Sequence, residues 1–126
     1  MDNENKRRNT RNRVWPDTKA TIRVTDGFMV DRGGRIAVSG IVGNLGANGM
    51  FLKTFEDVPV PARADITINF DPDSKVADLF LYASGETVHT TGDGVGIKFT
   101  SINVAKLQQC IIEKMNRLEA QGLAQK

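Results

Sequence analysis

Residues 92–118 read GDGVGIKFTSINVAKLQQCIIEKMNRL, and the hydrophobic period of the chain changes within this stretch. In its first part, apolar side chains alternate with their neighbours over residues 95–99, which predicts a strand after a Gly-Asp-Gly turn. In its second part, apolar side chains recur at helical spacing, which predicts an amphipathic helix over about residues 103–119. Asn103 is suitably placed as its N-cap, and Gly122 lies beyond its expected end. The expected core-facing residues of the helix are Leu107, Ile111, Met115 and Leu118.

Upstream of this stretch, the period of two recurs in several short segments that are separated by turn residues. Short strands with frequent turns favour a β-barrel or a β-sandwich. We therefore expect a mainly β domain in which the C-terminal helix closes one mouth of the barrel. The expected strands lie near residues 20–24, 36–42, 50–52, 66–70, 76–82 and 86–90.

The length and composition indicate one soluble domain. A chain of 126 residues is long enough to bury a core. No apolar run reaches the roughly 20 residues that would span a bilayer, and the N-terminus lacks the apolar segment of a secretory signal. The single cysteine, Cys110, cannot form an intramolecular disulfide and is expected to be a small buried hydrophobe. We expect a cytoplasmic protein without membrane insertion.

Basic residues are concentrated at the N-terminus. Residues 1–13 carry five basic and two acidic side chains, whereas the rest of the chain carries 12 basic and 13 acidic ones. No residue from Asp2 to Arg13 is apolar, so we expect this segment to be flexible without a partner. The chain is therefore divided into a flexible arginine-rich tail, residues 1–13, and a globular part, residues 14–120. A basic tail on a nearly neutral body indicates an anionic partner.

Three short segments of the chain carry the residues that suggest a function. Residues 5–11 read NKRRNTR, with Arg7 and Arg11 four residues apart. Residues 44–49 read NLGANG, and residues 94–99 read GVGIKF, just before the predicted helix. The first two segments resemble the RxxxR and [D/N]xSxxG motifs of the PilZ domain family, and the third is similar to the glycine-rich final strand of that family. The resemblance covers nearly the whole chain.

The resemblance implies a small antiparallel PilZ-like barrel of the split-barrel type. It also implies a non-catalytic bacterial receptor that binds cyclic di-GMP, uses no metal or other cofactor, and signals to a protein effector as its tail becomes ordered. The ligand-binding residues implied by the two motifs, with the neighbouring arginine, are Arg7, Arg8, Arg11, Asn44, Gly46 and Gly49.

The chemistry of these residue types suits a cyclic dinucleotide. A guanidinium is a planar set of donors that fits phosphate oxygens, and it fits O6 and N7 of guanine equally well. The carboxamide of Asn44 can accept hydrogen bonds from the Watson–Crick edge of guanine. Gly46 and Gly49 are expected to shape a turn whose backbone amides face the anion.

Gly46 occupies the position of the motif serine, which is a departure from the family pattern. In family members that bind, the serine hydroxyl donates a hydrogen bond to the ligand. Loss of one neutral hydrogen bond costs about 0.5–1.5 kcal/mol. We therefore expect binding to be weaker by roughly threefold to tenfold.

Several other interpretations remain open from the sequence. The domain could be a degenerate PilZ domain that acts as a nucleotide-independent protein-interaction module. The tail could be a solvated terminus, and residues 44–49 could form a simple hairpin turn. A nucleic-acid-binding barrel is disfavoured by the scarcity of aromatic residues. His89 and Cys110 suggest no catalytic triad, and no residues have metal-ligand spacing, so His89 is expected to be structural or exposed.

Overall fold

The computed structural model describes residues 18–25, 36–74 and 79–125, and the side chains within these ranges up to residue 120. The tail of residues 1–13, with the predicted ligand-binding arginines Arg7, Arg8 and Arg11, lies outside the described residues, as do residues 26–35 and 75–78. Part of the strand expected near residues 76–82 is therefore also outside them.

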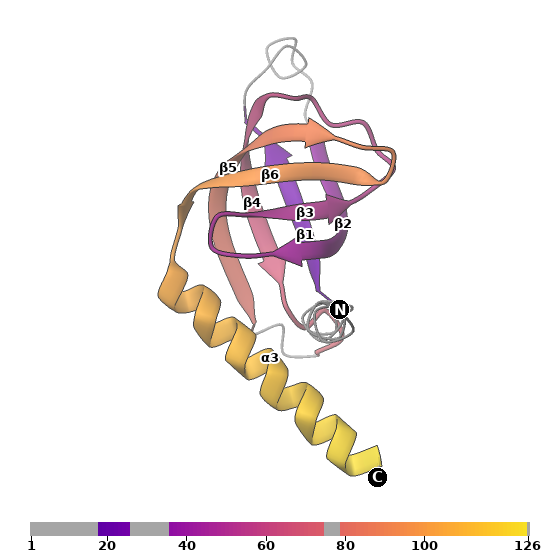
Figure 1. Cartoon of the computed structure of the whole chain (residues 1–126), viewed down its shortest axis with the longest axis vertical. Coiled ribbons are helices and arrows are strands. Elements are labelled where there is room, and N and C mark those ends of the chain that lie inside the picture. The colour runs from indigo at the N-terminus through magenta and orange to yellow at the C-terminus, as the bar shows by residue number, and fades with distance from the viewer. Residues whose placement is uncertain (1–17, 26–35, 75–78, 126) are drawn as a thin grey trace, which may run out of the picture.

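Six antiparallel strands form a closed barrel in the order β1-β2-β3-β6-β5-β4 (Figure 1). The closed barrel confirms the mainly β fold and resolves the alternative of barrel or sandwich. All strands are paired on both sides, so the described sheet has no free edge. The strands are β1 (Lys19–Val24), β2 (Ile36–Leu45), β3 (Gly49–Lys53), β4 (Ala62–Asn69), β5 (Phe80–Thr90) and β6 (Gly94–Ile102).

The interior of the barrel is filled by the apolar residues of the period-two segments. Along β1 and β4, every second side chain is buried and its neighbours face outward, as the alternation predicted. Phe70, directly after β4, is fully buried among them. The outward positions are therefore the ones available for a ligand.

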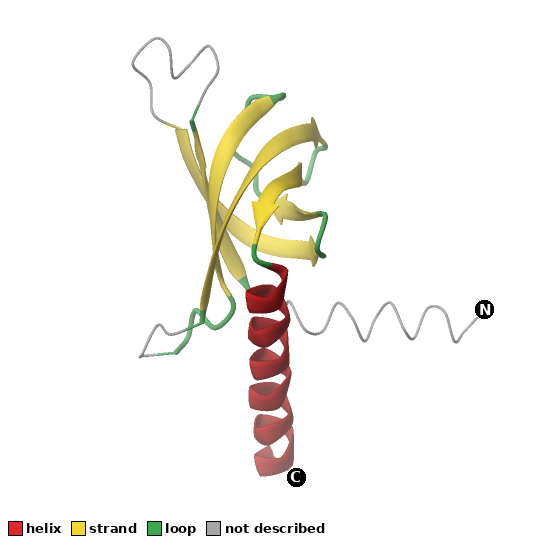
Figure 2. Cartoon of the chain, turned by 90° about the vertical axis from the view of Figure 1, so that its left-hand side faces the viewer, coloured by secondary structure: helices red, strands yellow, loops and turns green. Residues whose placement is uncertain are grey.

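The helix α3 (Val104–Gln125) covers one end of the barrel and continues beyond it (Figure 2). Asn103 caps it as predicted, because its Oδ1 accepts a hydrogen bond from the amide of Lys106 at 2.9 Å. The helix continues to Gln125 instead of ending near residue 119. A single glycine such as Gly122 costs only about 1 kcal/mol in a helix, so it does not have to end one.

The face of α3 that packs on the barrel agrees with the predicted one at Leu107 and Ile111 but not at Met115. Leu107 and Cys110 are buried, but Met115 is 50% exposed, so Met115 is not a core residue. The position beside it, Lys114, is buried instead. The helix is rotated about its axis relative to the apolar stripe because a polar contact also sets its orientation.

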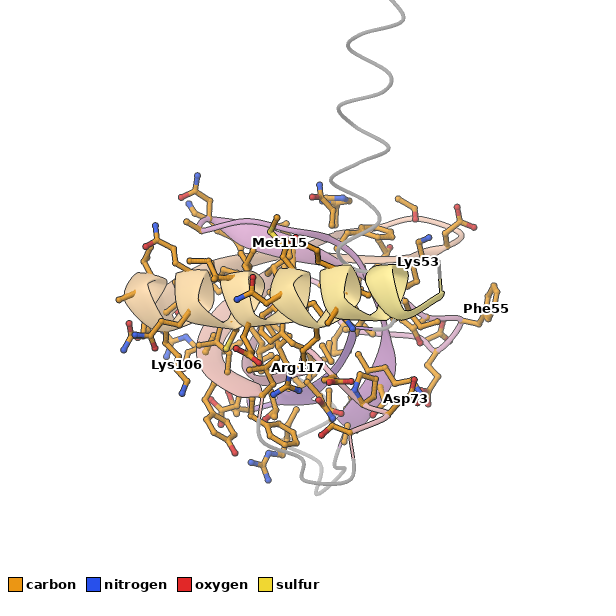
Figure 3. All side chains as sticks on the ribbon, turned by 90° about the horizontal axis from the view of Figure 1, so that it is seen from below. Lys53, Phe55, Asp73, Lys106, Met115 and Arg117 are labelled. Atoms are coloured by element: carbon orange, nitrogen blue, oxygen red, sulfur yellow. The ribbon has the colours of Figure 1, made fainter. Side chains whose placement is uncertain are left out.

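That polar contact is an ion pair between Arg117 and the segment after β4. The Nη1 of Arg117 donates to Oδ2 of Asp71 at 2.6 Å, and its Nε donates to Oε2 of Glu113 at 2.9 Å. In the view from below, α3 crosses the end of the barrel with Arg117 on the side of Asp73, near this segment (Figure 3). The ion pair thus holds the middle of the helix on the barrel.

We predict that Asp71→Asn lowers the free energy of unfolding by about 1 kcal/mol, because the Arg117 contact is partly shielded from water. Glu113→Gln removes the other carboxylate that contacts Arg117. Because the Glu113 side chain is more exposed than that of Asp71, this variant should lower the free energy of unfolding by no more than about 0.5 kcal/mol. Urea unfolding of both variants measures the difference. Equal losses would mean that the Asp71 contact does not fix the helix.

Candidate functional site

The outward side chains of four neighbouring strands meet in one row. In the strand register, Asn44 of β2 lies opposite Phe51 of β3, Phe51 lies opposite Gly96 of β6, and Gly96 lies opposite His89 of β5. Residues that are directly opposite each other on antiparallel strands are about 4.5–5.5 Å apart. The row therefore gathers an amide, an aromatic ring and an imidazole from segments that are far apart in the sequence.

A bulge in β2 turns Asn44 outward. The register of β2 against β3 shifts between Val42 and Asn44, so Gly43 is the extra residue. Without this shift, alternation from the buried Val42 would have made Asn44 face inward. The bulge thus brings the predicted ligand residue to the outer surface, where it is exposed.

A surface hollow of about 520 Å³ lies over this row. Its volume is within the range of roughly 300–1,000 Å³ that small-molecule sites occupy. Gly43, Gly49 and Gly96 are among the residues that line it. The side chains around it come from Asn44, Asn48, Phe51, Lys53, His89 and Lys98.

The described residues that line this hollow include the cations Lys53 and Lys98 and no carboxylate. Three other hollows on the described surface each include at least one carboxylate, from Asp65, Glu86, Glu56 or Asp93. The charges therefore favour an anionic ligand in the hollow above Asn44 and Phe51 more than in the other three hollows.

His89 was not predicted as a site residue. Its imidazole lies against the outer face of Gly96, where a Cβ would collide with the ring. The ring is exposed, as expected from the sequence, and forms part of the hollow. A second register shift, between Thr87 and His89, determines this position, and alternation in the sequence does not reveal it.

The predicted glycines have different roles. Gly49 lines the hollow, and a Cβ there would collide with the backbone carbonyl of Ile97 on β6. Gly46 lies in the turn outside the residues that line the hollow, and nothing lies within 4 Å of a Cβ added to it. Neither glycine has a φ in the left-handed region, so conformational freedom does not explain them.

The amide of Gly46 is engaged within the turn. It donates to the carbonyl oxygen of Gly49 at 2.9 Å, and the carbonyl oxygen of Asn48 accepts from the amide of Phe99 at 2.8 Å. These two bonds fix the turn between β2 and β3 against β6. The Gly46 amide is thus bonded within the turn in the described structure, and its contact with a ligand stays a prediction.

The described residues contain no group of three or more His, Cys, Asp and Glu side chains that could hold a metal ion. Cys110 is buried as expected, and burial raises the pKa of its thiol, an effect that the nearby Lys106 cation only partly offsets. A thiol of this kind is a poor nucleophile at neutral pH. Among the described residues, no helix combines the length and the apolar character required to cross a membrane.

The chain matches a protein family along most of its length. The family model described as PilZ domain matches residues 5–114, which include both predicted motifs and the whole barrel. No curated protein and no solved structure matches the chain significantly.

We predict that Gly49→Ala lowers the free energy of unfolding by about 1–3 kcal/mol, because the added methyl group forces β3 away from β6. Gly46→Ala is the matched control at the other end of the same turn. It should leave stability unchanged or raise it by up to about 1 kcal/mol, since its surroundings are open and alanine restricts the unfolded chain. Chemical denaturation compares the two, and a larger loss for Gly46→Ala would contradict the geometry.

Proposed function

The chain belongs to the PilZ domain family, whose members are in general receptors for cyclic di-GMP, and we propose that it is such a receptor. In this proposal the ligand binds over the row of Asn44, Phe51, Gly96 and His89, and residues 1–13 close over it. The protein catalyses no reaction, acts in the cytoplasm, and signals to a protein effector. The observation that carries the proposal is the hollow with two lysines and no described carboxylate, beside the family motif of residues 44–49.

The point at which the tail joins the barrel supports the proposal. The carbonyl oxygen of Thr18, the first described residue, accepts from the amide of Val42 at 2.9 Å. Thr18 therefore lies beside β2 only two residues before Asn44. An extended chain covers about 3.3–3.6 Å per residue, so Arg11, seven residues before Thr18, can reach as far as about 25 Å. This distance is larger than the width of the four strands that form the hollow.

The residues around the hollow complement the parts of a cyclic dinucleotide. Arg7 and Arg11 would bind phosphate oxygens or the O6 and N7 edge of guanine. Lys98 would add a further positive charge beside the phosphates. Asn44 would accept from the Watson–Crick edge of a base, and the imidazole of His89 offers a flat surface for stacking.

The cost of ordering the tail limits the affinity. Fixing the backbone of one residue costs about 1–2 kcal/mol, and the arginine contacts must exceed the total. Because these contacts are ionic, we expect binding to weaken as salt increases.

A second candidate function is a nucleotide-independent protein-interaction module. Gly46 favours it, because the motif serine is missing and the Gly46 amide is already bonded within the turn. Nucleic acid is not proposed as the ligand, since a compact hollow lined by Phe51 and His89 offers no extended stacking surface for a strand.

The primary test is isothermal titration with cyclic di-GMP at near-physiological salt, with GMP and cyclic GMP as controls. We expect saturable binding of the cyclic dinucleotide only, and no measurable binding by Arg7→Ala or Arg11→Ala. Lys98→Gln should weaken binding about tenfold and reduce its salt dependence. Arg23→Gln removes an exposed cation from β1, outside the hollow, and should change the affinity less than twofold.

Two results would contradict the proposal. If the Arg7 and Arg11 variants bind as well as the parent, the tail does not hold the ligand. If the parent releases no heat and gains no thermal stability at high cyclic di-GMP, the interaction-module function is favoured instead.

Restoring the motif serine by Gly46→Ser should tighten binding by roughly threefold to tenfold, the value of one neutral hydrogen bond. The open surroundings of Gly46 accept the side chain without strain, so stability should not fall. Gly46→Ala, which adds a methyl group without a hydroxyl, is the control in the same titration. Equal affinities for the serine and alanine variants would show that the hydroxyl does not reach the ligand.

A further inference from the structure

A second hollow, about 710 Å³ in volume, adjoins the first on the outer face of the barrel. Its apolar part is formed by Ile41, Phe51 and Phe55. Phe51 and Lys53 line both hollows, so the two are continuous across β3. We call this second hollow the Phe55 surface and define it by Ile41, Phe51, Lys53, Phe55, Glu56 and Asp93.

The apolar side chains of the Phe55 surface are exposed. The exposed fraction is 94% for Phe55 and 45% for Ile41. Viewed from the helix end, Phe55 points away from the barrel, and Lys53 is on the same side of the molecule (Figure 3). A single exposed apolar side chain is ordinary, whereas here two exposed apolar side chains line one hollow.

Backbone and side-chain hydrogen bonds hold the loop that carries Phe55. The amide of Thr54 donates to the carbonyl oxygen of Asp93 at 3.0 Å, which ties the end of β3 to the turn before β6. The amide of Glu56 donates to Oγ1 of Thr54 at 3.1 Å. These bonds hold the backbone on both sides of Phe55, so part of the entropy cost of ordering this loop has already been met by folding.

The charges around the Phe55 surface define the partner that fits it. Glu56 and Asp93 border the apolar side chains, Asp57 follows in the exposed loop, and Lys53 is the one cation among the described lining residues. A second copy of the chain related by a two-fold axis would place this surface, with its excess of carboxylates, against itself, which is unfavourable. A basic segment with an apolar anchor is complementary to both features.

We propose that the Phe55 surface docks a segment of a different protein, in which a large apolar side chain lies beside lysine or arginine. The apolar side chain packs against Phe55 and Ile41, and the basic one faces Glu56 and Asp93. This inference deepens the proposed function, because it assigns the surface through which the receptor meets its effector.

Lys53 couples the two sites. Without nucleotide, its ammonium group lies at the docking surface and repels the basic side chain of the partner. Phosphate oxygens bound in the neighbouring hollow neutralise that charge, so cyclic di-GMP strengthens docking. By thermodynamic reciprocity, the partner strengthens nucleotide binding by the same factor.

Photo-crosslinking tests the identity of the occupant. A benzoyl-phenylalanine is introduced at Phe55 of the full chain in bacterial cells, and at Tyr82, which is exposed on β5, as the control. We expect an adduct specific to position 55, and peptide sequencing should place it in another protein beside an apolar residue flanked by lysine or arginine. An adduct with a second copy, with residues 1–17 of the same chain or with an acidic segment would overturn the proposal. So would the absence of an adduct specific to position 55.

A synthetic peptide of the crosslinked segment then tests the energetics with purified protein. Phe55→Ser should weaken peptide binding at least tenfold, which equals about 1.4 kcal/mol, and leave the affinity for cyclic di-GMP within twofold. Unchanged peptide binding by Phe55→Ser would overturn the docking surface. Since the peptide is titrated both with and without nucleotide, failure of docking and failure of nucleotide binding are distinguished.

The coupling is tested with Lys53→Gln in the same titrations. In the parent, cyclic di-GMP should tighten peptide binding by roughly threefold to tenfold, in the range of ordinary allosteric coupling. In Lys53→Gln the peptide should bind with the same affinity in the presence and absence of nucleotide. Persistence of the full effect in Lys53→Gln would overturn the role of this lysine.

Discussion

The close approach of β3 to β6 is the constraint on which the barrel and the site both depend. These two strands are paired along the whole of β3, and glycine occurs at both ends of the contact (Figure 1). A Cβ on Gly49 would collide with the carbonyl of Ile97, and a Cβ on Gly94 would collide with the carbonyl of Leu52. The strands pair closely because these positions lack side chains. Gly49 and Gly96 also line the hollow, and the imidazole of His89 lies against Gly96, so the strand pairing that closes the barrel also positions the hollow.

The fold could be predicted because its strands are exposed to water on one face and packed on the other. β1 and β4 repeat their hydrophobic pattern every two residues, and the change to helical spacing after Asn103 identifies the helix. The orientation of the helix could not be predicted in the same way. The apolar stripe favoured Met115, but Lys114 is buried instead, and Asp71 attracts Arg117. The hydrophobic period reveals the apolar stripe of the helix, but it does not reveal the contributions of Lys114 and Arg117 to the orientation of the helix.

The site was predictable where it depends on one local segment. The motif of residues 44–49 identified Asn44 and Gly49, which line the hollow. Phe51, His89 and Lys98 were missed, because their proximity depends on the register between strands and on two bulges. A bulge moves one side chain from one face of the sheet to the other and leaves no signal in the period of a short strand. The predicted ligand-binding arginines of the tail, Arg7, Arg8 and Arg11, lie outside the described residues, so their role stays a prediction.

The closed sheet also limits how a signal can leave the site. Every strand is bonded on both sides, so a ligand that changed the register of one strand would have to break a full ladder of hydrogen bonds. Communication through a new barrel conformation is therefore costly, whereas communication through a shared side chain requires no rearrangement of the sheet. Lys53 and Phe51 lie in both hollows, and a change of charge at a site about one strand away is effective because it acts within a Debye length of about 8 Å. A barrel of this kind can therefore link a nucleotide to a protein partner through its surface alone, and its rigidity keeps the two sites in contact.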